Sequence, residues 1–428
     1  MRSEYQPSEV DGTLRAKDFV MACQPIFSRD LDVFAYELLF RRCIGDECAV
    51  ISDYDDATSQ IIADGFTLAS QRLGKNGKVT INVGCDNIVS RNVLALPSDR
   101  ALLEIPGDTQ TTGDFLGAAK ELRKAGYQFL VDNYDPDSPG ACELLAVADY
   151  VKVPVNGLDG KRVAQVKRSL SGWNGKTVAA RVENWEAYAG CKYLGFDFFQ
   201  GFFFAYPKDL VGKKISSFKT ARLKLLQLLS DEEASLSEIV NVISADQALS
   251  IRLLNFVNSV AFSLENRVDS LKRAASLVGL NTLKKWAMSA ALSDLDSSGK
   301  GVELSFMAMH GATFLGLLAE KHTLGDCSAE TLYLLGLLNN VDALMGMKMK
   351  EVVDGMPLLA VVKKALVRDP QEPLTRFLQL LDAIGRGDWN QAQTLLRAVG
   401  IPLSMAATLY LQAGRDVGEL MASLTKTN

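Results

Sequence analysis

The sequence lacks paired cysteines, basic runs and long apolar runs, and each absence argues against a class of protein. Its seven cysteines are scattered, odd in number and without a Cys-x-x-Cys pair, which favours free thiols in a reducing compartment. No cluster of Lys and Arg marks a nucleic-acid or lipid surface, and the net charge of −5 is that of an ordinary soluble protein. We therefore expect protein or small-ligand partners, and neither nucleic acid nor membrane.

No apolar run reaches the roughly 20 residues that span a bilayer. The first residues are polar and of mixed charge, without the apolar core of a signal peptide, so we expect a cytoplasmic protein with a disordered tail over residues 1–17. A chain of 428 residues exceeds the size at which one core stops growing, which favours two domains.

Residues 18–205 alternate between β-rich segments and segments of helical period. The expected strands are 20–27, 33–40, 79–83, 101–105, 128–131, 150–153, 177–180 and 198–201. The expected helices between them include 56–73, 112–125, 139–148 and 158–170. Eight strands with intervening helices predict a closed α/β barrel, whose first two strands are antiparallel because a short loop joins them.

Polar residues recur where these strands end. Glu37 lies in a buried strand, so it must be a ligand or half of an ion pair, for example with Arg41. Asn82, Glu104 and Asp132 close the next three parallel strands, and barrel enzymes keep their chemistry on that rim. Such oxygen-rich groups suit Mg²⁺ or Mn²⁺, and Lys152 on the following strand would complement a phosphate.

These segments resemble, in order, the motifs of the EAL domain, a family of cyclic-di-GMP phosphodiesterases with a modified (β/α)8 TIM-like barrel. The matching motifs are Gln24-Pro25-Ile26, Glu37-Leu38-Leu39-Phe40-Arg41, Ile81-Asn82-Val83, Leu103-Glu104-Ile105, Val131-Asp132-Asn133, Tyr150-Val151-Lys152-Val153 and Phe199-Gln200-Gly201. The resemblance implies metal-ligand positions at Glu37, Asn82, Glu104 and Asp132, an active-site lysine at Lys152, a rim glutamine at Gln200 and a ligand-phosphate contact at Arg41.

The sequence departs from this pattern where a second metal would bind. Asn133 replaces the second of paired aspartates, Pro154 replaces another acid, and Ala180 replaces a glutamate, with Arg181 beside it where the family has glycine. Only Glu183 of that segment survives. Two-metal hydrolysis requires these carboxylates, so we expect no cofactor, and Mg or Mn only if the rim retains one metal.

Residues 206–215 predict a linker, and residues 216–428 show apolar residues at helical spacing throughout, which predicts an all-α domain. Residues 243–259 and 274–280 resemble the signature of the HDOD domain, a helical relative of metal-dependent HD phosphohydrolases that lacks their ligands. The domain has only His310 and His322, and amides at Asn339 and Asn340, so a metal is not expected there. We expect His310 to be a partly buried packing residue and His322 a solvated one.

Arg252, Asn255 and Asn258 are spaced by three and share a helix face, either for bonding within the domain or for a partner. The residues together favour a non-catalytic signalling adaptor with degenerate EAL and HDOD domains. By family analogy its partners would be two-component or cyclic-di-GMP pathway proteins, with a homodimer as a further option. Two alternatives remain: a nucleotide sensor that binds at Arg41, Lys152 and Gln200, and a weak residual phosphodiesterase.

Overall fold

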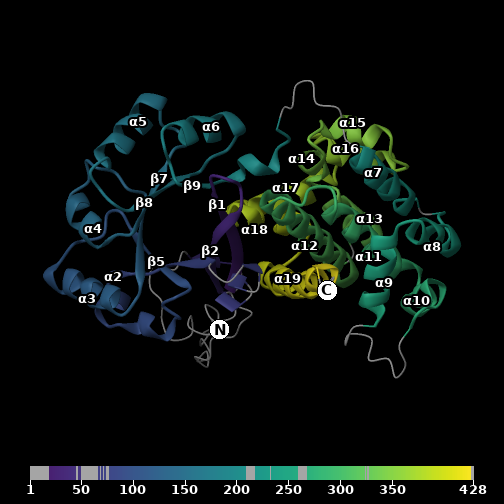
Figure 1. Ribbon diagram of the computed structural model, residues 1–428, viewed down its shortest axis with the longest axis horizontal. Coiled ribbons are helices and arrows are strands. Elements are labelled where there is room, and N and C mark those ends of the chain that lie inside the picture. Colours follow the sequence, from purple (N-terminus) through teal and green to yellow (C-terminus); the bar gives the residue numbers. More distant parts are fainter. Residues whose placement is uncertain are drawn as a thin grey trace, which may run out of the picture.

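The computed structural model describes residues 19–44, 47–49, 66–67, 69–70, 72–73, 77–208, 217–231, 233–258, 268–322, 324 and 327–425. The predicted tail, most of the predicted helix 56–73 and most of the predicted linker lie outside these residues. In Figure 1 the strands with their covering helices occupy one side of the molecule, and the helices of the second half occupy the other. The division into domains at 206–215 stays a prediction.

Eight strands close a barrel. They are β1 (Phe19–Ser28), β2 (Val33–Ile44), β4 (Lys78–Asn82), β5 (Ala101–Pro106), β6 (Gln128–Asp132), β7 (Tyr150–Pro154), β8 (Lys176–Ala180) and β9 (Phe198–Gln200). Their order is β1-β9-β8-β7-β6-β5-β4-β2, and β2 pairs back to β1. β1 is antiparallel to both neighbours and the other barrel pairs are parallel, while β3 (Glu47–Ala49) extends β2 as a hairpin. The predicted barrel and its antiparallel first pair are confirmed.

Helices cover the parallel strands from outside: α2 (Cys85–Val89), α3 (Gly113–Lys124), α4 (Ala141–Val147), α5 (Gly160–Ser169) and α6 (Trp185–Tyr193). Short 3-10 helices, η2 (Asn92–Ala95) and η3 (Phe202–Ala205), complete this part. Side chains of Thr112, Asp159 and Asn184 accept backbone N–H bonds at the starts of α3, α5 and α6. The barrel interior holds an apolar layer of five buried side chains: Ile26, Ala35, Leu102, Leu130 and Val178.

The second half is helical throughout its described residues. Its helices are α7 (Ser217–Leu229), α8 (Leu236–Ser244), α9 (Gln247–Val257), α10 (Leu271–Val278), α11 (Leu280–Ser293), α12 (Gly299–Lys321), α13 (Ala329–Leu337), α14 (Val341–Met345), α15 (Met349–Asp354), α16 (Ala360–Leu366), α17 (Thr375–Gly385), α18 (Trp389–Arg397) and α19 (Leu403–Thr425). Ser235 and Glu238 form a capping box at the start of α8. The predicted all-α architecture is confirmed.

The central helix of this half is α12, which packs against α13 and α19. By length and composition it could cross a membrane, although the sequence pattern predicted no such segment. However, most of its apolar part is buried inside the protein, as is typical of a core helix.

The first two strands are covered from outside in a different way. A tight turn joins β1 to β2, with Ser28 N–H donating to Asp32 O at 2.8 Å, so no helix of the barrel lies between them. Instead α17 and α19 contact β1, and α12 contacts β2. Figure 1 shows these two strands, in purple, beside the helical half. The helical half thereby fills the gap in the outer layer of the barrel.

The two histidines differ in how well they were predicted. His310 on α12 is buried, packs against Tyr410 with ring centroids 4.0 Å apart, and has its Nε2 2.8 Å from Tyr410 O. His322 is half-buried and bonds Val399 O through Nε2 at 3.2 Å, so the expectation of a solvated side chain is wrong. It faces the loop after α18, a contact that no local pattern indicates.

We expect His310 to make stability depend on pH. Burial lowers its pKa to about 4, the bond to Tyr410 opposes this, and the nearby charge of Arg72 lowers it further. Between about pH 6.5 and 4 the unfolded chain binds a proton that the folded chain excludes, so stability falls as pH falls in that window. Relative to pH 7.5, His310 should cost about 2 kcal/mol at about pH 5. Urea unfolding at both pH values should show a smaller loss for His310→Gln, and an equal loss would contradict this account.

Candidate functional site

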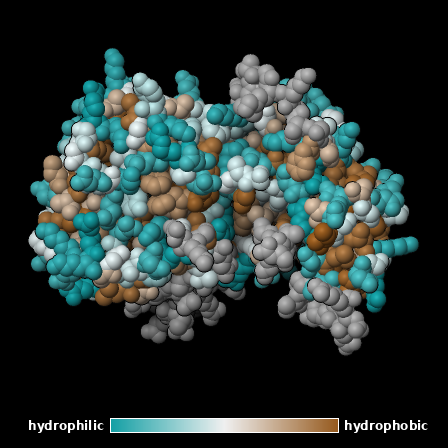
Figure 2. Space-filling view, viewed as in Figure 1, coloured by the Kyte–Doolittle hydropathy of each residue, from teal (hydrophilic) through white to brown (hydrophobic). Residues whose placement is uncertain are grey.

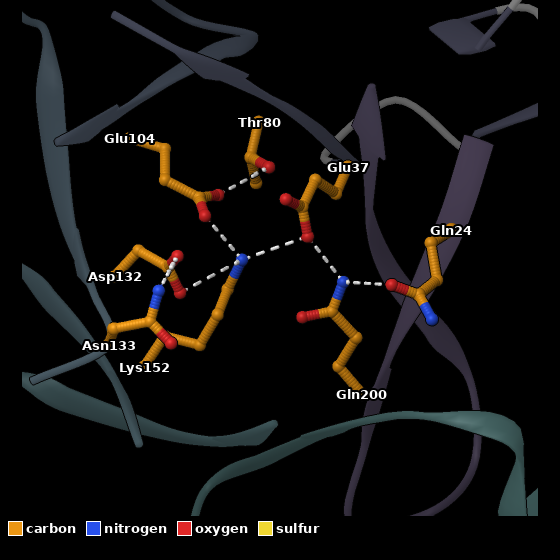
Figure 3. Close-up of polar contacts among 8 residues, drawn as sticks. All are labelled: Gln24, Glu37, Thr80, Glu104, Asp132, Asn133, Lys152 and Gln200. Carbon is orange, nitrogen blue, oxygen red and sulfur yellow. Dashed lines mark hydrogen bonds and ion pairs between the residues drawn. The ribbon is translucent and has the colours of Figure 1, made fainter. Parts of the chain in front are cut away.

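The polar residues at the strand ends meet on one rim of the barrel (Figure 3). Glu37 comes from β2, Glu104 from β5, Asp132 from β6 and Lys152 from β7, and their side chains converge. Lys152 Nζ lies 2.5 Å from Glu104 Oε1, 2.9 Å from Glu37 Oε2 and 3.8 Å from Asp132 Oδ1. Each of these four residues follows, by two positions on its own strand, a residue that belongs to the apolar layer or packs against it. Because side chains alternate between the two faces of a strand, all four therefore face the barrel interior.

The acids of this cluster differ in ionisation. Burial would raise the pKa of Glu37, but Lys152, Gln200 and Asn82 together hold it below its usual value. Burial and the adjacent charge of Glu37 instead raise the pKa of Glu104 to about 8. Burial opposes the charge of Lys152, yet its three acidic neighbours hold its pKa well above the usual range. Burial also raises the pKa of Asp132, so Glu37 is the member of the cluster whose ionised form is favoured, and Glu104 is the member whose protonated form is favoured most.

Neutral side chains hold the acids in place. Gln200 Nε2 donates to Glu37 Oε2 and to Gln24 Oε1, the latter at 2.9 Å, and Thr80 Oγ1 donates to Glu104 Oε2 at 3.0 Å. Glu37 and Gln24 are register partners in β1–β2. Gln24 and Thr80 were not predicted as site residues. The available signal was alternation, since Thr80 precedes Asn82 by two residues and so faces the same interior.

The rim also has the chemistry of a metal site, with one obstacle. Carboxylate and amide oxygens of Glu37, Asn82, Glu104 and Asp132 are the hard donors that Mg²⁺ and Mn²⁺ prefer. Within the part of the chain that the structure describes, no three His, Cys, Asp or Glu side chains stand in a metal-binding arrangement. In the rim, the Lys152 ammonium lies between the acids and balances their charge. The donor types thus suit a divalent ion, which would have to displace this ammonium in order to bind.

The substituted positions lie around this cluster. Ala180 is buried at the end of β8, and Arg181 follows with a left-handed φ of 57°, its side chain exposed. Glu183 is exposed and accepts a bond from Asn156 Nδ2 at 2.8 Å, so it does not join the cluster. Pro154 ends β7 without an acidic group.

Two further positions concern the charge of the rim. Asn133 donates from Nδ2 to Asp132 Oδ2 at 2.7 Å, where an aspartate would repel it. The Arg41 side chain lies outside the described residues, although its backbone pairs with Val20 in β1–β2. The described partners of Glu37 are Lys152, Gln200 and Asn82.

The candidate partner residues on α9 are largely engaged within the helical half. Arg252 donates to both oxygens of Asp294, at 3.0 and 2.7 Å, and Asn258 holds the N–H and carbonyl of Val268, both at 2.7 Å. Asn255 is exposed. On the face drawn in Figure 2, hydrophobic side chains gather toward the right, over the helical half. Partner binding and a homodimer stay predictions.

The sequence profile of the HDOD domain matches residues 215–356. Over 411 residues the chain is 27% identical to a Vibrio cholerae protein named cyclic di-GMP phosphodiesterase CdgJ, covering 94% of this chain and 93% of that protein. Over 387 residues it is 26% identical to the uncharacterized protein YuxH of Bacillus subtilis, covering 88% and 92%.

Solved structures of EAL proteins resemble the barrel part. An EAL domain protein from Listeria monocytogenes has 16% identity and a TM-score of 0.37, covering 44% of this chain and 87% of its own. Klebsiella pneumoniae BlrP1, in a calcium and cyclic di-GMP complex, has 21% identity and a TM-score of 0.37, covering 46% and 57%.

The amino-terminal part is a closed barrel, and the match to the HDOD domain lies within the helical half that follows it. One expectation is corrected by the relatives. The interpretation as a non-catalytic adaptor, and not an enzyme, is wrong, because a relative that aligns over nearly the whole chain is named a phosphodiesterase. The description of the two domains as degenerate stays a prediction, and so does the cytoplasmic location.

Proposed function

We propose that this chain, an EAL-like barrel followed by an HDOD domain, hydrolyses a phosphodiester bond of cyclic di-GMP at the barrel rim. The observation that carries the proposal is the convergence of Glu37, Glu104, Asp132 and Lys152. Support also comes from the full-length similarity to a protein named as such an enzyme. A cluster of buried acids around a single cation is costly to maintain for stability alone, which is consistent with a catalytic use.

A divalent ion would be held by Glu37, Asn82, Glu104 and Asp132. When bound, such an ion polarises a phosphoryl oxygen and lowers the pKa of a water molecule. Gln200 and Asn82 fix the carboxylate of Glu37, and Thr80 fixes that of Glu104. Lys152 Nζ, released from these acids, would supply a positive charge for a phosphate at the rim. The apolar layer below closes the barrel interior.

The test is product analysis of the full chain with cyclic di-GMP and Mn²⁺ or Mg²⁺. We expect linear dinucleotide, and a loss of roughly 100-fold or more in Glu37→Gln and in Glu104→Gln, because each removes a carboxylate that a divalent ion would bind while keeping the shape of the side chain. Glu143→Gln is the matched control, since Glu143 is exposed on α4. Absence of linear product at high enzyme concentration, or product that persists in both variants, would refute the proposal.

A further inference from the structure

Two adjacent residues of β2 face opposite sides of the barrel wall. Glu37 points into the interior, where Lys152 and Gln200 bond it. Tyr36 points outward, where its hydroxyl donates to Glu303 Oε2 of α12 in the helical half. Both Tyr36 and Glu303 are 3% exposed. One strand therefore carries a rim acid on one face and a hydrogen bond to the helical half on the other.

Arg72 completes this outer contact. Its Nη2 lies 2.8 Å from Glu303 Oε1 and 2.7 Å from Oε2, and its guanidinium carbon lies 4.2 Å from the centroid of the Tyr36 ring. On its other side the guanidinium covers the Phe306 ring at 3.6 Å. We call Tyr36, Arg72 and Glu303 the outer triad. It joins β2, the segment before β4, and α12.

The outer triad buries two opposite charges, and burying a charge costs free energy unless it is paired. The side chains of Arg72 and Glu303 are 12% and 3% exposed, so each depends on the other for neutralisation. Among the described residues Arg72 has Glu303 as its ion-pair partner, and that partner comes from the other half of the chain. Unlike a surface ion pair, this contact cannot be broken without leaving a charge buried beside β2.

The strand beside β2 depends on the helical half in the same way. Gln24 of β1 accepts a hydrogen bond from Gln200 Nε2, and the same Nε2 donates to Glu37. Gln24 therefore helps to orient the amide that aligns Glu37. Gln24 and Pro25 also line a small cavity of about 70 Å³, to which His310 and Tyr410 contribute from the helical half. Both strands that set the position of Glu37 are thus supported by helices of the other half.

We propose that Glu303 is a positioning residue of the barrel site: the HDOD half supplies it to hold Tyr36 and Arg72, and thereby fixes β2 and the Glu37 carboxylate. The inference rests on the proposed function for its catalytic meaning. It makes the helical half an integral support of the site, although α12 contributes nothing to the rim itself. A change in how α12 packs on β2 would then change turnover without any contact to substrate.

The test compares Glu303→Gln with Glu320→Gln in the full chain. Glu303→Gln keeps the shape of the outer triad but removes its negative charge, and Glu320 is an exposed residue of the same helix. We expect kcat to fall by about tenfold or more in Glu303→Gln, with KM for cyclic di-GMP nearly unchanged, as for residues that orient a metal ligand. Glu320→Gln should match the wild type.

A double-mutant cycle distinguishes a specific coupling between Glu303 and Arg72 from a general loss of folded protein. Adding Arg72→Met to Glu303→Gln removes the buried cation as well, so the double variant should lose less than the two single losses combined. Assays at a temperature where circular dichroism shows every variant fully folded ensure that kcat reports active molecules. The inference would be overturned if the kcat losses of Glu303→Gln and Arg72→Met simply added in the double variant. It would also be overturned if Glu303→Gln lost no more kcat than Glu320→Gln.

Hydrogen exchange separates this inference from the proposed function. Backbone amides of β2 should exchange about tenfold faster in Glu303→Gln, while those of β8, which lies three strands from β2 in the barrel, should not change. If the wild type makes no linear product, the proposed function fails, and exchange in β2 alone decides whether Glu303 holds that strand. Unchanged protection of β2 in Glu303→Gln would overturn the inference.

Discussion

Replacing Lys152 by methionine should destabilise the folded chain by about 3–5 kcal/mol, because it removes the cation from a buried cluster of acids. The Lys152 side chain is 3% exposed, and it contacts Glu104, Glu37 and Asp132. Methionine fills a similar volume, so the loss reports charge more than packing. Urea unfolding followed by circular dichroism, with EDTA present, measures it.

A divalent ion should reverse much of this loss. Mn²⁺ added to Lys152→Met meets the same acids without a competing ammonium. At a Mn²⁺ concentration of a hundred times Kd it should stabilise the variant by about 2.7 kcal/mol relative to the variant in EDTA, and the wild type by less. Lys167→Met is the matched control, because Lys167 on α5 bonds the neutral Thr177 hydroxyl at 2.7 Å. A loss no larger than in that control, or no effect of Mn²⁺, would contradict this view of the rim.

Gly201→Ala, which adds a single methyl group beside the site, should strongly reduce the stability of the folded chain. Gly201 follows Gln200 directly, its φ is 145°, and a Cβ there would lie 2.1 Å from Val182 O and 2.4 Å from Val182 N. Because these are backbone atoms, the strand end must move, and Gln200 would move with it. Strain and overpacking together should cost about 3 kcal/mol or more.

The matched control for this change is Gly117→Ala. Gly117 lies within α3 and an added Cβ would meet nothing within 4 Å, so alanine should stabilise the chain by up to about 1 kcal/mol. Urea midpoints of the two variants should therefore move in opposite directions, and Gly201→Ala should also lose turnover. An unchanged urea midpoint for Gly201→Ala would contradict this prediction, because it would mean that the backbone around Val182 moves to accommodate the added Cβ at little cost.

The barrel could be predicted from the sequence because the patterns that indicate its strands lie within short segments of the chain. Strand periodicity of two and the return of a polar residue at each strand end are visible within single segments, and all eight strands lie where they were expected. The same periodicity placed Glu37, Glu104, Asp132 and Lys152 on one rim, and the structure brings these four together. The pairing of Glu37 with Arg41 stays a prediction, because the Arg41 side chain lies outside the described residues, and the contact that the structure shows is with Lys152, 115 residues away in the sequence.

The outer triad was not predictable from the sequence alone. Tyr36 and Glu303 are 267 residues apart, and Glu303 sits in a helix whose other residues are mostly apolar. Nothing in either segment distinguishes this contact from an exposed charge. The functional prediction failed for a related reason: it weighed the substitutions at Asn133 and Ala180, whereas the acids that remain still converge around one point.

The last helix of the chain covers the first strand. Because α19 packs on β1, the outer side of that strand stays exposed on the ribosome until residue 403 and beyond have been made. At about 5–20 residues per second, the wait is on the order of 20–80 seconds. Over that interval the outer face of β1 lacks part of its cover, so a chain that terminates before α17 has neither of the helices that pack on this strand and exposes apolar surface to chaperones and proteases.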